Sequence, residues 1–360
     1  MAKIVFIVPS IRDSHCKNRI IEFQEHGYEV EVFGFSREGQ KRPDSLPYQV
    51  SILGELRDED YKERVALYLK AFKRIRNLFK SEKVLFYLNG LDIALFFHFV
   101  NPSAEYIYEE CDLTHTYLSK LKKPLEWLDK KIIKGSLLTV LTSEGFIEYH
   151  YGTEKKPENV VLVENKLNPS VLNYPKNKGK VFLKDSLSIG FVGGPRFDSV
   201  FNFIDVYCRN FPQGVFHIYG GPITSQFEAL KKYDNCIFHG FFSNPSDLPA
   251  IYESIDLVIA TYDTKFENVR YAEPNKIYES IYFETPIVVS SGTYLARKVE
   301  QLGIGYDINA MNDEEIINFV KALTRESLEK KALCASKIDK GETLNINNYL
   351  FDRINLVWKG

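Results

Sequence analysis

The chain alternates short apolar runs with stretches whose apolar residues recur at helical spacing. Residues 4–8 and 29–33 are predicted strands, and residues 17–26 between them are a predicted helix closed by Gly27. A strand, a helix and a second strand predict parallel pairing with a right-handed crossover. The alternation continues, with further strands expected at 48–53, 84–88, 106–108, 137–141 and 160–163, and helices at 57–80, 91–100 and 143–151.

A second series of the same kind follows a break in this pattern. Pro, Asn, Lys and Gly cluster without periodicity at 164–169 and again at 174–180, which predicts a linker. Beyond it we expect strands at 187–192, 215–219, 236–238, 257–260 and 287–290, and helices at 200–209, 226–233, 248–254, 295–301, 312–323 and 347–358.

This organisation predicts an α/β protein made of two Rossmann-like, doubly wound domains. The first domain is expected at 1–165, joined by a C-terminal helix at 345–360, and the second at 166–344. With 360 residues, the chain is long enough for both. The loop after the first strand, residues 9–14, holds no glycine, which disfavours a dinucleotide-binding dehydrogenase.

Composition narrows the function classes further. The net charge of −2 excludes a strongly basic nucleic-acid binder, so no nucleic-acid partner is expected. Five scattered cysteines without a CxxC pair predict reduced thiols and a cytoplasmic protein. The five apolar residues 4–8 are too few for a signal segment or a membrane span.

The stretch 271–291 carries the most specific chemistry. It is predicted to form a loop, a short helix, a turn and a buried strand, with Pro274 in the first helical turn. Lys276 and Glu279 are three residues apart and share one face of that helix. A helix start with a lysine suits a phosphate, and a carboxylate one turn later suits a ribose diol, which together describe a nucleoside diphosphate. The alternative is an ordinary surface ion pair.

The motif Pro274-Asn275-Lys276-x-x-Glu279, followed by Thr285-Pro286-Ile287-Val288-Val289, resembles the donor-site signature of GT-B glycosyltransferases, especially family 4. In that family the glutamate holds the ribose and the lysine faces the diphosphate. Many members carry a second glutamate that would fall on Tyr271 here, while Glu273 is off register.

The resemblance implies two domains that face each other across a cleft, with the last helix returning to the first domain. It implies a hexosyltransferase-type enzyme that transfers a sugar from a UDP- or GDP-sugar to an acceptor hydroxyl, with retention and without a metal or cofactor. The acceptor would be a glycan or a lipid-linked glycan in surface polysaccharide synthesis. A sugar-nucleotide 2-epimerase and a non-catalytic nucleotide-sugar-binding subunit remain alternatives.

Other residues of the second half are expected at the donor site. Gly193 and Gly194 follow a strand and permit close backbone approach, and Arg196 after them suits a phosphate. With Lys276 it would stabilise the departing diphosphate. By resemblance, Gly220 lines the nucleotide cleft and Phe242 borders the base, although Phe242 also suits core packing. Tyr262 and Asn275 complete the expected donor contacts.

In the first half, the segment 109–115 is expected to follow the carboxyl end of a strand, where ligands bind in open α/β sheets. Asp112 and His115 are its candidates for catalytic residues, which could hydrogen-bond sugar hydroxyls or act as a base, with a solvated loop as the alternative. The acidic triplet at 58–60 is interpreted as charge at a helix start rather than as a metal site.

Residues 119–134 form a basic amphipathic stretch. Leu125, Leu128 and Ile132 recur at helical spacing, and lysines crowd the opposite side. Such a helix either packs its stripe on the core or lies on an anionic membrane surface, and the second option would place the protein peripherally on the inner face of the cell membrane.

Overall fold

The structure is a computed structural model that describes residues 2–37, 46–57, 61–175, 182 and 186–359. The acidic triplet at 58–60 and the linker from residue 176 to residue 180 lie outside this range. Contacts between Cα atoms divide the chain into two compact units. The N-terminal unit comprises Met1–Glu164 and Asn347–Gly360, and the C-terminal unit comprises Asn165–Ile346.

The N-terminal unit holds a parallel sheet of seven strands in the order β3-β2-β1-β4-β5-β6-β7. Because the order reverses beside β1, the unit is doubly wound and has its switch point between β1 and β4. The strands are β1 (Lys3–Val8), β2 (Glu29–Arg37), β3 (Val50–Leu56), β4 (Leu85–Asn89), β5 (Tyr106–Glu110), β6 (Leu138–Leu141) and β7 (Val160–Leu162).

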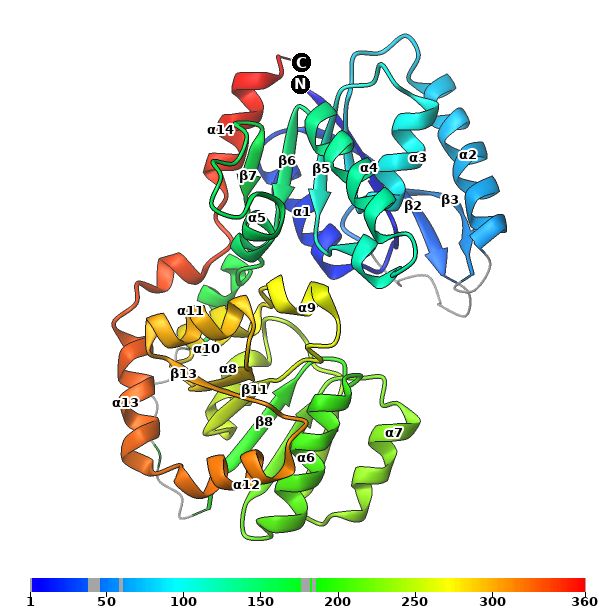
Figure 1. Ribbon diagram of the computed structural model, residues 1–360. Helices are drawn as coiled ribbons and strands as arrows, with labels where there is room; N and C mark the ends of the chain where they lie inside the picture. The colour runs from blue at the N-terminus through cyan, green and yellow to red at the C-terminus, as the bar shows by residue number, and fades with distance from the viewer. Residues whose placement is uncertain (1, 38–45, 58–60, 176–181, 183–185, 360) are drawn as a thin grey trace. The chain divides into compact units, whose positions relative to one another are not determined.

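Helices cover both faces of this sheet (Figure 1). On one face, Ile20 and Phe23 of α1 share a core cluster with Phe351 and Ile354 of α14. On the other, Phe72 of α2 packs on α3. The helices are α1 (Ser14–Glu25), α2 (Tyr61–Leu78), α3 (Leu91–Val100), the 3-10 helix η1 (Thr114–Tyr117), α4 (Lys122–Gly135), α5 (Glu144–Tyr151) and α14 (Asn348–Val357).

The C-terminal unit repeats this plan with six parallel strands in the order β10-β9-β8-β11-β12-β13. The strands are β8 (Ser188–Val192), β9 (Val215–Tyr219), β10 (Cys236–Gly240), β11 (Leu257–Ala260), β12 (Ile287–Ser290) and β13 (Gly305–Ile308). The helices are η2 (Pro169–Asn173), α6 (Asp198–Asn210), α7 (Ser225–Glu228), η3 (Ala229–Lys232), α8 (Leu248–Ser254), α9 (Glu267–Tyr271), α10 (Lys276–Tyr282), α11 (Tyr294–Leu302), α12 (Asp313–Ala322), α13 (Arg325–Ser336) and η4 (Lys340–Thr343).

Two doubly wound α/β units confirm the fold class predicted from the sequence, and the last helix does return to the first unit. Its return has an apolar cause, because Leu350 and Ile354 are fully buried against strands of the N-terminal sheet. The indole Nε1 of Trp358 also donates a hydrogen bond to Glu105 at 3.0 Å. In the described residues, no helix is long and apolar enough to cross a membrane.

Candidate functional site

The signature stretch forms a short helix between two buried strands. Helix α10 begins at Lys276 with Asn275 as its N-cap, so Pro274 precedes the helix rather than lying in its first turn. The segment between β11 and α10 is also partly helical, because α9 occupies Glu267–Tyr271. Tyr271, where the missing glutamate would fall, is the last residue of α9.

Lys276 and Glu279 form an ion pair that is not a surface pair. The Nζ atom of Lys276 lies 2.9 and 2.8 Å from the two carboxylate oxygens of Glu279, and the side chains are 12% and 1% exposed. The Tyr252 hydroxyl donates to Glu279 Oε2 at 2.6 Å. A buried carboxylate costs desolvation energy unless it is paired and hydrogen-bonded, and here it is both. Its position is therefore fixed by the fold.

Glu273, the off-register glutamate, has a different environment. Its carboxylate lies 2.5 Å from Lys298 Nζ, and it accepts a hydrogen bond from the Tyr278 hydroxyl. Since its side chain is buried, these contacts fasten the loop before α10 to α11. The arrangement supports a structural role for Glu273.

Glycines let the backbones after β8 and β9 approach each other. The Gly193 amide donates to Tyr219 O at 2.7 Å, and the Gly220 amide donates to Gly240 O at 2.7 Å. Gly220 has φ +127°, and a Cβ there would collide with Gly193 O. Only glycine fits this position. Gly194 is exposed beside it, at the carboxyl edge of the sheet where ligands bind.

Arg196 and Tyr262 lie at the same edge as Glu279. The exposed Arg196 guanidinium lies over the Phe197 ring at 5.1 Å, and Phe197 in turn contacts Tyr262 with ring centroids 4.7 Å apart. Burial raises the pKa of Tyr262, the Glu279 charge raises it further, and the Arg196 charge opposes the rise. The charges of Glu279 and Arg196 therefore both influence the Tyr262 hydroxyl, in opposite directions.

The amides at the start of α6 already have protein partners. Asp263, in the loop after β11, accepts from Asp198 N at 3.2 Å and from Ser199 N and Oγ at 2.8 and 2.7 Å. A helix start is a favourable phosphate site when its amides are open. Here a carboxylate occupies these amides, so the start of α6 is not open to a phosphate.

The two phenylalanines after β10 differ in exposure. Phe242 is half-buried and packs on the core cluster that also contains Ile277 and Tyr252. Phe241 is 80% exposed, and its ring lies close to Gly221. The packing expected as the alternative for Phe242 is thus observed, and Phe241 presents the free aromatic surface at this loop.

In the N-terminal unit the acidic segment is not entirely a loop. Glu109 and Glu110 are the last residues of β5 and are fully buried. Asp112 follows the strand and is exposed. His115 lies in η1 with 1% exposure, and its Nε2 is 3.2 Å from the Tyr149 hydroxyl. The expectation that the whole segment follows the strand is therefore wrong, and His115 lies in the interior.

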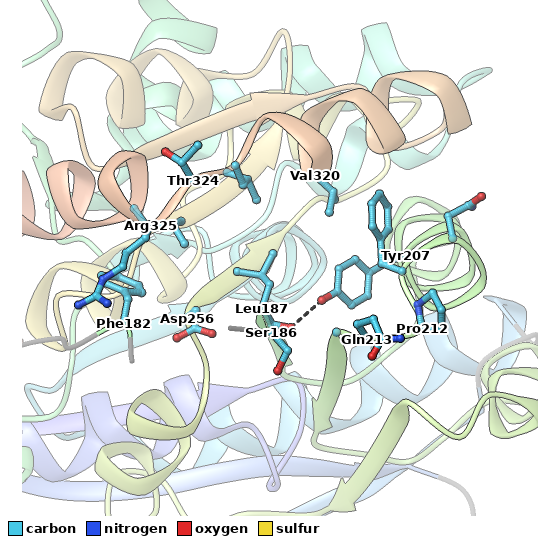
Figure 2. A pocket seen from close by; sticks show the side chains of 15 residues that line it. Phe182, Ser186, Leu187, Tyr207, Pro212, Gln213, Asp256, Val320, Thr324 and Arg325 are labelled. Atoms are coloured by element: carbon cyan, nitrogen blue, oxygen red, sulfur yellow. Dashed lines mark hydrogen bonds between the residues drawn. The ribbon is translucent and has the colours of Figure 1, made fainter. Parts of the chain in front are cut away.

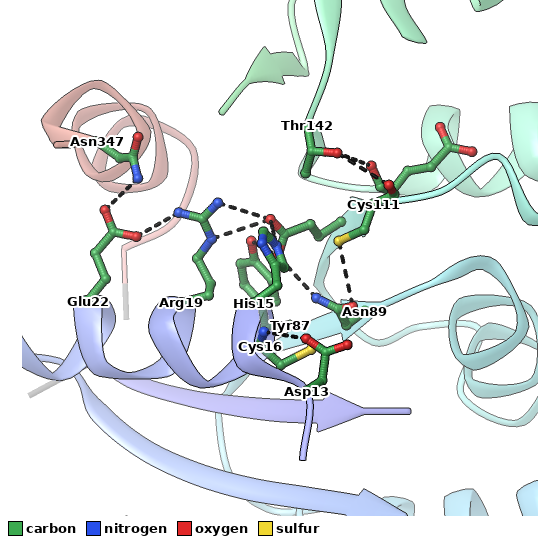
Figure 3. A network of polar contacts seen from close by, with 12 residues as sticks. Asp13, His15, Cys16, Arg19, Glu22, Tyr87, Asn89, Cys111, Thr142 and Asn347 are labelled. Atoms are coloured by element: carbon green, nitrogen blue, oxygen red, sulfur yellow. Dashed lines mark hydrogen bonds and ion pairs between the residues drawn. The ribbon is translucent and has the colours of Figure 1, made fainter. Parts of the chain in front are cut away.

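Glu109 instead joins a network that the sequence did not reveal (Figure 3). Its Oε1 lies 2.9 Å from His15 Nε2 and accepts from Arg19 Nη2 at 3.0 Å. Its Oε2 accepts from the Tyr87 hydroxyl at 2.9 Å and from Asn89 at 3.1 Å. The network lies where β1, β4 and β5 end, and only the strand pairing brings these distant residues together.

Among the residues that the structure describes, two clusters have the residue types that bind metal ions. His15, Glu109 and Cys111 form one, and Glu110, Asp129 and His150 form the other, each with ligand atoms within 4.8 Å of one another. In the first, the guanidinium of Arg19 already binds Glu109 Oε1, which disfavours a cation at that oxygen. In the second, burial raises the pKa of Glu110 to about 8, and burial with the Glu110 charge raises that of Asp129. A proton shared between the two carboxyls fits this cluster.

A hollow in the C-terminal unit lies at one edge of its sheet, opposite to the edge that carries Glu279, Arg196 and Tyr262. Its lining includes Leu187 and Asp256, which immediately precede β8 and β11, and the Tyr207 hydroxyl that donates to Leu187 O at 2.7 Å (Figure 2). Ligands of open α/β sheets bind at the carboxyl ends of the strands. The hollow is therefore not part of the candidate donor site.

Helix α4 carries two kinds of apolar residue. Leu125 and Leu128 are half-buried and Ile132 is buried, so the predicted stripe does face the core. A second apolar group is exposed in and just before the helix: Tyr117 (49%), Leu118 (38%), Leu121 (53%) and Trp127 (60%). Exposed lysines stand among them at 120, 123, 130, 131 and 134. The solvated side of this helix is thus basic and apolar together.

Comparison with solved structures shows which fold this arrangement belongs to. Sucrose-phosphate synthase from Thermosynechococcus elongatus superimposes with a TM-score of 0.72 and 13% identity, covering 99% of this chain and 100% of that chain. The Anabaena protein HepE, solved in complex with UDP and glucose, superimposes with a TM-score of 0.69 and 14% identity, covering 99% and 100%. This chain has the GT-B fold.

A protein from Listeria monocytogenes assigned as a UDP-N-acetylglucosamine 2-epimerase shares the fold, with a TM-score of 0.61, 12% identity and coverage of 94% and 93%. No protein-family model matches the chain, and no curated protein matches it in sequence. Proteins of both kinds, glycosyltransferases and a protein assigned as an epimerase, have the same fold as this chain. The fold therefore does not decide between these activities, and the choice depends on the site.

Proposed function

We propose that the protein is a glycosyltransferase that moves a sugar from a nucleoside-diphosphate sugar to an acceptor hydroxyl. The observation that carries the proposal is the fixed carboxylate of Glu279, held by Lys276 and Tyr252 at the ligand-binding edge of the C-terminal sheet. A carboxylate so placed accepts two hydrogen bonds from a ribose diol. Gly193 and Gly220 bring two backbones close together at the same edge, where their main-chain groups could contact the donor.

The chemistry follows from where charge develops. As the bond between the anomeric carbon and the phosphate oxygen breaks, the nucleoside diphosphate gains negative charge, and the sugar becomes oxocarbenium-like. Arg196 and Lys276 would stabilise that charge. Losing one such contact costs about 2.7–4 kcal/mol in the barrier by analogy with oxyanion donors. Two cations make a metal ion dispensable in this proposal.

The structural relatives favour UDP over GDP as the nucleotide, because HepE is solved with UDP. Phe241 offers a free ring on which a base could stack, and Phe242 would border it from the core side. The transferred sugar is expected to be a hexose, as the sequence resemblance implies. Tyr262 and Asn275 would contact the donor, and Asp112 the acceptor side.

The acceptor is proposed to be a glycan or a lipid-linked glycan used in surface polysaccharide synthesis. The support is the basic and apolar surface of α4, which suits an anionic membrane. Contact there would give an enzyme in the cytoplasm access to a lipid-linked substrate from the inner face of the membrane.

The binding test compares two lysine–glutamate pairs with the same spacing. In the site variant, Lys276→Gln and Glu279→Gln are combined. In the control, Lys231→Gln and Glu228→Gln remove an exposed pair at 2.6 Å in the same unit. We expect UDP to raise the melting temperature of the wild type and the control but not of the site variant, because ligand binding stabilises the folded state. Equal UDP shifts in all three proteins would refute the donor site.

The activity test uses UDP- and GDP-sugars with and without acceptors. Transfer, or slow hydrolysis of the donor, supports the glycosyltransferase. An isomerised nucleotide sugar would indicate the 2-epimerase instead, and binding without chemistry would indicate a non-catalytic subunit.

A further inference from the structure

Four polar side chains of the N-terminal unit meet in its interior, and each comes from a different element. Glu110 is the last residue of β5, His115 lies in η1, Asp129 in α4 and His150 in α5. The two carboxylates are fully buried, and the side chains of the two histidines are 0% and 1% exposed. This group lies outside the candidate donor site, which belongs to the C-terminal unit.

The two carboxylates of this group lack the cationic partner that a buried charge normally has. Glu109, the residue before Glu110, is equally buried, and Arg19 pairs with it at 3.0 Å. In the part of the chain that the structure describes, neither Glu110 nor Asp129 pairs with a lysine or an arginine, and both face histidines only. Buried charges are paired or bind metal ions. A proton shared by the two carboxyls balances one negative charge, whereas a divalent cation balances both.

Two oxygens of this group also accept no hydrogen bond. The Tyr108 hydroxyl donates to Asp129 Oδ1 at 3.0 Å, but among the described residues no group donates to Asp129 Oδ2 or to Glu110 Oε1. Asp129 Oδ2 instead faces two imidazole nitrogens, His150 Nε2 at 3.7 Å and His115 Nδ1 at 3.9 Å. A buried polar atom without a partner is costly, and a bound ion satisfies it.

The spacing of the four candidate ligand atoms fits a tetrahedral ion. Zinc binds histidine nitrogen and carboxylate oxygen at about 2.0–2.2 Å, so the ligand atoms of a tetrahedral site lie about 3.4 Å apart. The distances here bracket that value, because Glu110 Oε2 is 2.7 Å from His150 Nε2 and Asp129 Oδ2 is 3.7 and 3.9 Å from the two imidazoles. Two nitrogens and two oxygens favour zinc over magnesium and calcium, which prefer oxygen ligands alone.

Two tyrosines orient the candidate ligands from outside. The Tyr149 hydroxyl lies 3.2 Å from His115 Nε2, which directs Nδ1 of the same ring toward Asp129. The Tyr108 hydroxyl holds Asp129 Oδ1, so Oδ2 faces the imidazoles. Hydrogen bonds to the atom of a ligand that does not touch the metal are typical of built metal sites.

We propose that Glu110, His115, Asp129 and His150 bind one zinc ion, which ties β5, η1, α4 and α5 together. With four protein ligands the site is closed, as structural zinc sites are, and it leaves no position for a substrate. In the metal-free protein the proton shared by Glu110 and Asp129 takes the place of the ion, so Glu110 titrates only in that form. The proposal is independent of the transferase function, because no step of sugar transfer uses this ion.

The first test measures zinc binding by the full chain. The protein is treated with a chelator, dialysed and titrated with zinc chloride, and the bound zinc is measured by inductively coupled plasma mass spectrometry. We expect one zinc ion per chain and a melting temperature that rises with Zn²⁺ but not with Mg²⁺, because an ion bound to the folded state stabilises it. A wild type that binds no zinc overturns the proposal.

The second test locates the ion with one site variant and one control. Asp129→Asn keeps the shape of the side chain but removes its charge, and it should weaken zinc binding by more than the roughly 10- to 100-fold typical of losing an outer partner. His239→Gln is the control, because His239 Nε2 lies 3.0 Å from His217 Nδ1 in a surface pair that could bind zinc adventitiously. The control should keep the zinc affinity of the wild type. Equal affinity in the wild type and Asp129→Asn would show adventitious binding only and overturn the proposal.

Cobalt spectroscopy on the wild type gives an answer even if Asp129→Asn does not fold. Co²⁺ replaces Zn²⁺ in tetrahedral sites and then absorbs visible light strongly. We expect this absorption without a thiolate-to-cobalt band, because the four ligands include no cysteine. Weak absorption typical of octahedral Co²⁺ would overturn the proposal. A thiolate band would also overturn it, since it would place the ion at the cluster that contains Cys111.

Discussion

Glu110 illustrates how a buried residue can make stability depend on pH without touching a ligand. Its side chain is fully buried beside Asp129 of α4, and His150 Nε2 lies 2.7 Å from its Oε2. Burial, with a smaller contribution from the charge of Asp112, raises the pKa of Glu110 to about 8. Burial also lowers the pKa of His150, so this imidazole stays neutral at pH 7 and does not offset the carboxyl charge.

The sign of the effect follows from linkage. The pKa of Glu110 is higher in the folded state than its ordinary value of 4.5, so the folded state binds the proton more tightly. The associated stability is complete below pH 4.5 and is lost as the pH rises toward 8. We expect the free energy of unfolding to fall between pH 6.5 and about 8, by on the order of 1 kcal/mol for each pH unit.

Glu110→Gln should flatten this fall, because glutamine does not titrate. Urea unfolding at a series of pH values measures the free energy of unfolding of both proteins. Glu144→Gln, on the exposed start of α5, is the control. A wild type whose stability does not change over this pH range would contradict the protonated carboxyl.

For single residues, the sequence could predict contacts between side chains that are close along the chain, but not contacts between side chains that are far apart along it. Lys276 and Glu279 share a helical face by spacing alone, so their contact was predictable, although its burial was not. His15 and Glu109 are 94 positions apart, and they meet only because β5 lies beside β4 and β4 beside β1. His115 was selected for its place after a strand, but nothing local shows that its ring turns inward.

Among the elements, α4 makes the most specific prediction about a partner. Trp127 is 60% exposed, Lys131 Nζ lies 5.2 Å from the centre of its ring, and Leu121 is exposed near the helix start. An amphipathic surface with aromatic, aliphatic and lysine side chains inserts shallowly into anionic bilayers. Each lysine near such a surface adds about 1 kcal/mol of attraction.

We expect the double variant Leu121→Ser with Trp127→Ser to lower affinity for vesicles of phosphatidylcholine and phosphatidylglycerol about tenfold, through lost apolar burial. Co-sedimentation measures the bound fraction. Leu333→Ser, at a similarly exposed leucine of α13, serves as the control. Binding of the wild type that is equal on pure phosphatidylcholine, or absent from both vesicles, would argue against this surface.

Elements with strong apolar runs were predicted, whereas several weak ones were missed, and β13 and α13 are two examples. Strand β13, Gly305–Ile308, contains a glycine and an aspartate, which are both depleted in strands. It forms because β12 provides a pairing edge. Helix α13 buries only Leu328, Ala332 and Ala335 of its twelve residues, a stripe too weak to detect by periodicity. In both cases tertiary contacts supply what local sequence does not.

For the whole molecule, the important feature is that the two ends of the chain build one unit. Ile354 of α14 is fully buried in the same cluster as Phe23 of α1, and the Asn347 side chain donates to Glu22 at 2.7 Å. The last helix is therefore part of the N-terminal core and not an appendage.

Two substitutions on this helix test that statement. Ile354→Ala should lower the free energy of unfolding by about 2–5 kcal/mol, since it leaves a cavity in a packed core. Leu356→Ala, two residues on and 71% exposed, should change it by less than about 0.5 kcal/mol. Urea denaturation followed by tryptophan fluorescence reports on both, and equal effects would contradict the docking of α14.

The position of α14 has a consequence for biosynthesis. A ribosome delivers residues 1–164 first, but the helix that covers Ile20 and Phe23 is made only after all of Asn165–Ile346 has emerged. Until then an apolar strip of the nascent first unit is exposed to solvent, and such a surface attracts chaperones or neighbouring chains. The second unit is built from one continuous segment, so it needs no later part of the chain to complete it. During translation the later half of the protein can therefore fold completely before the earlier half does.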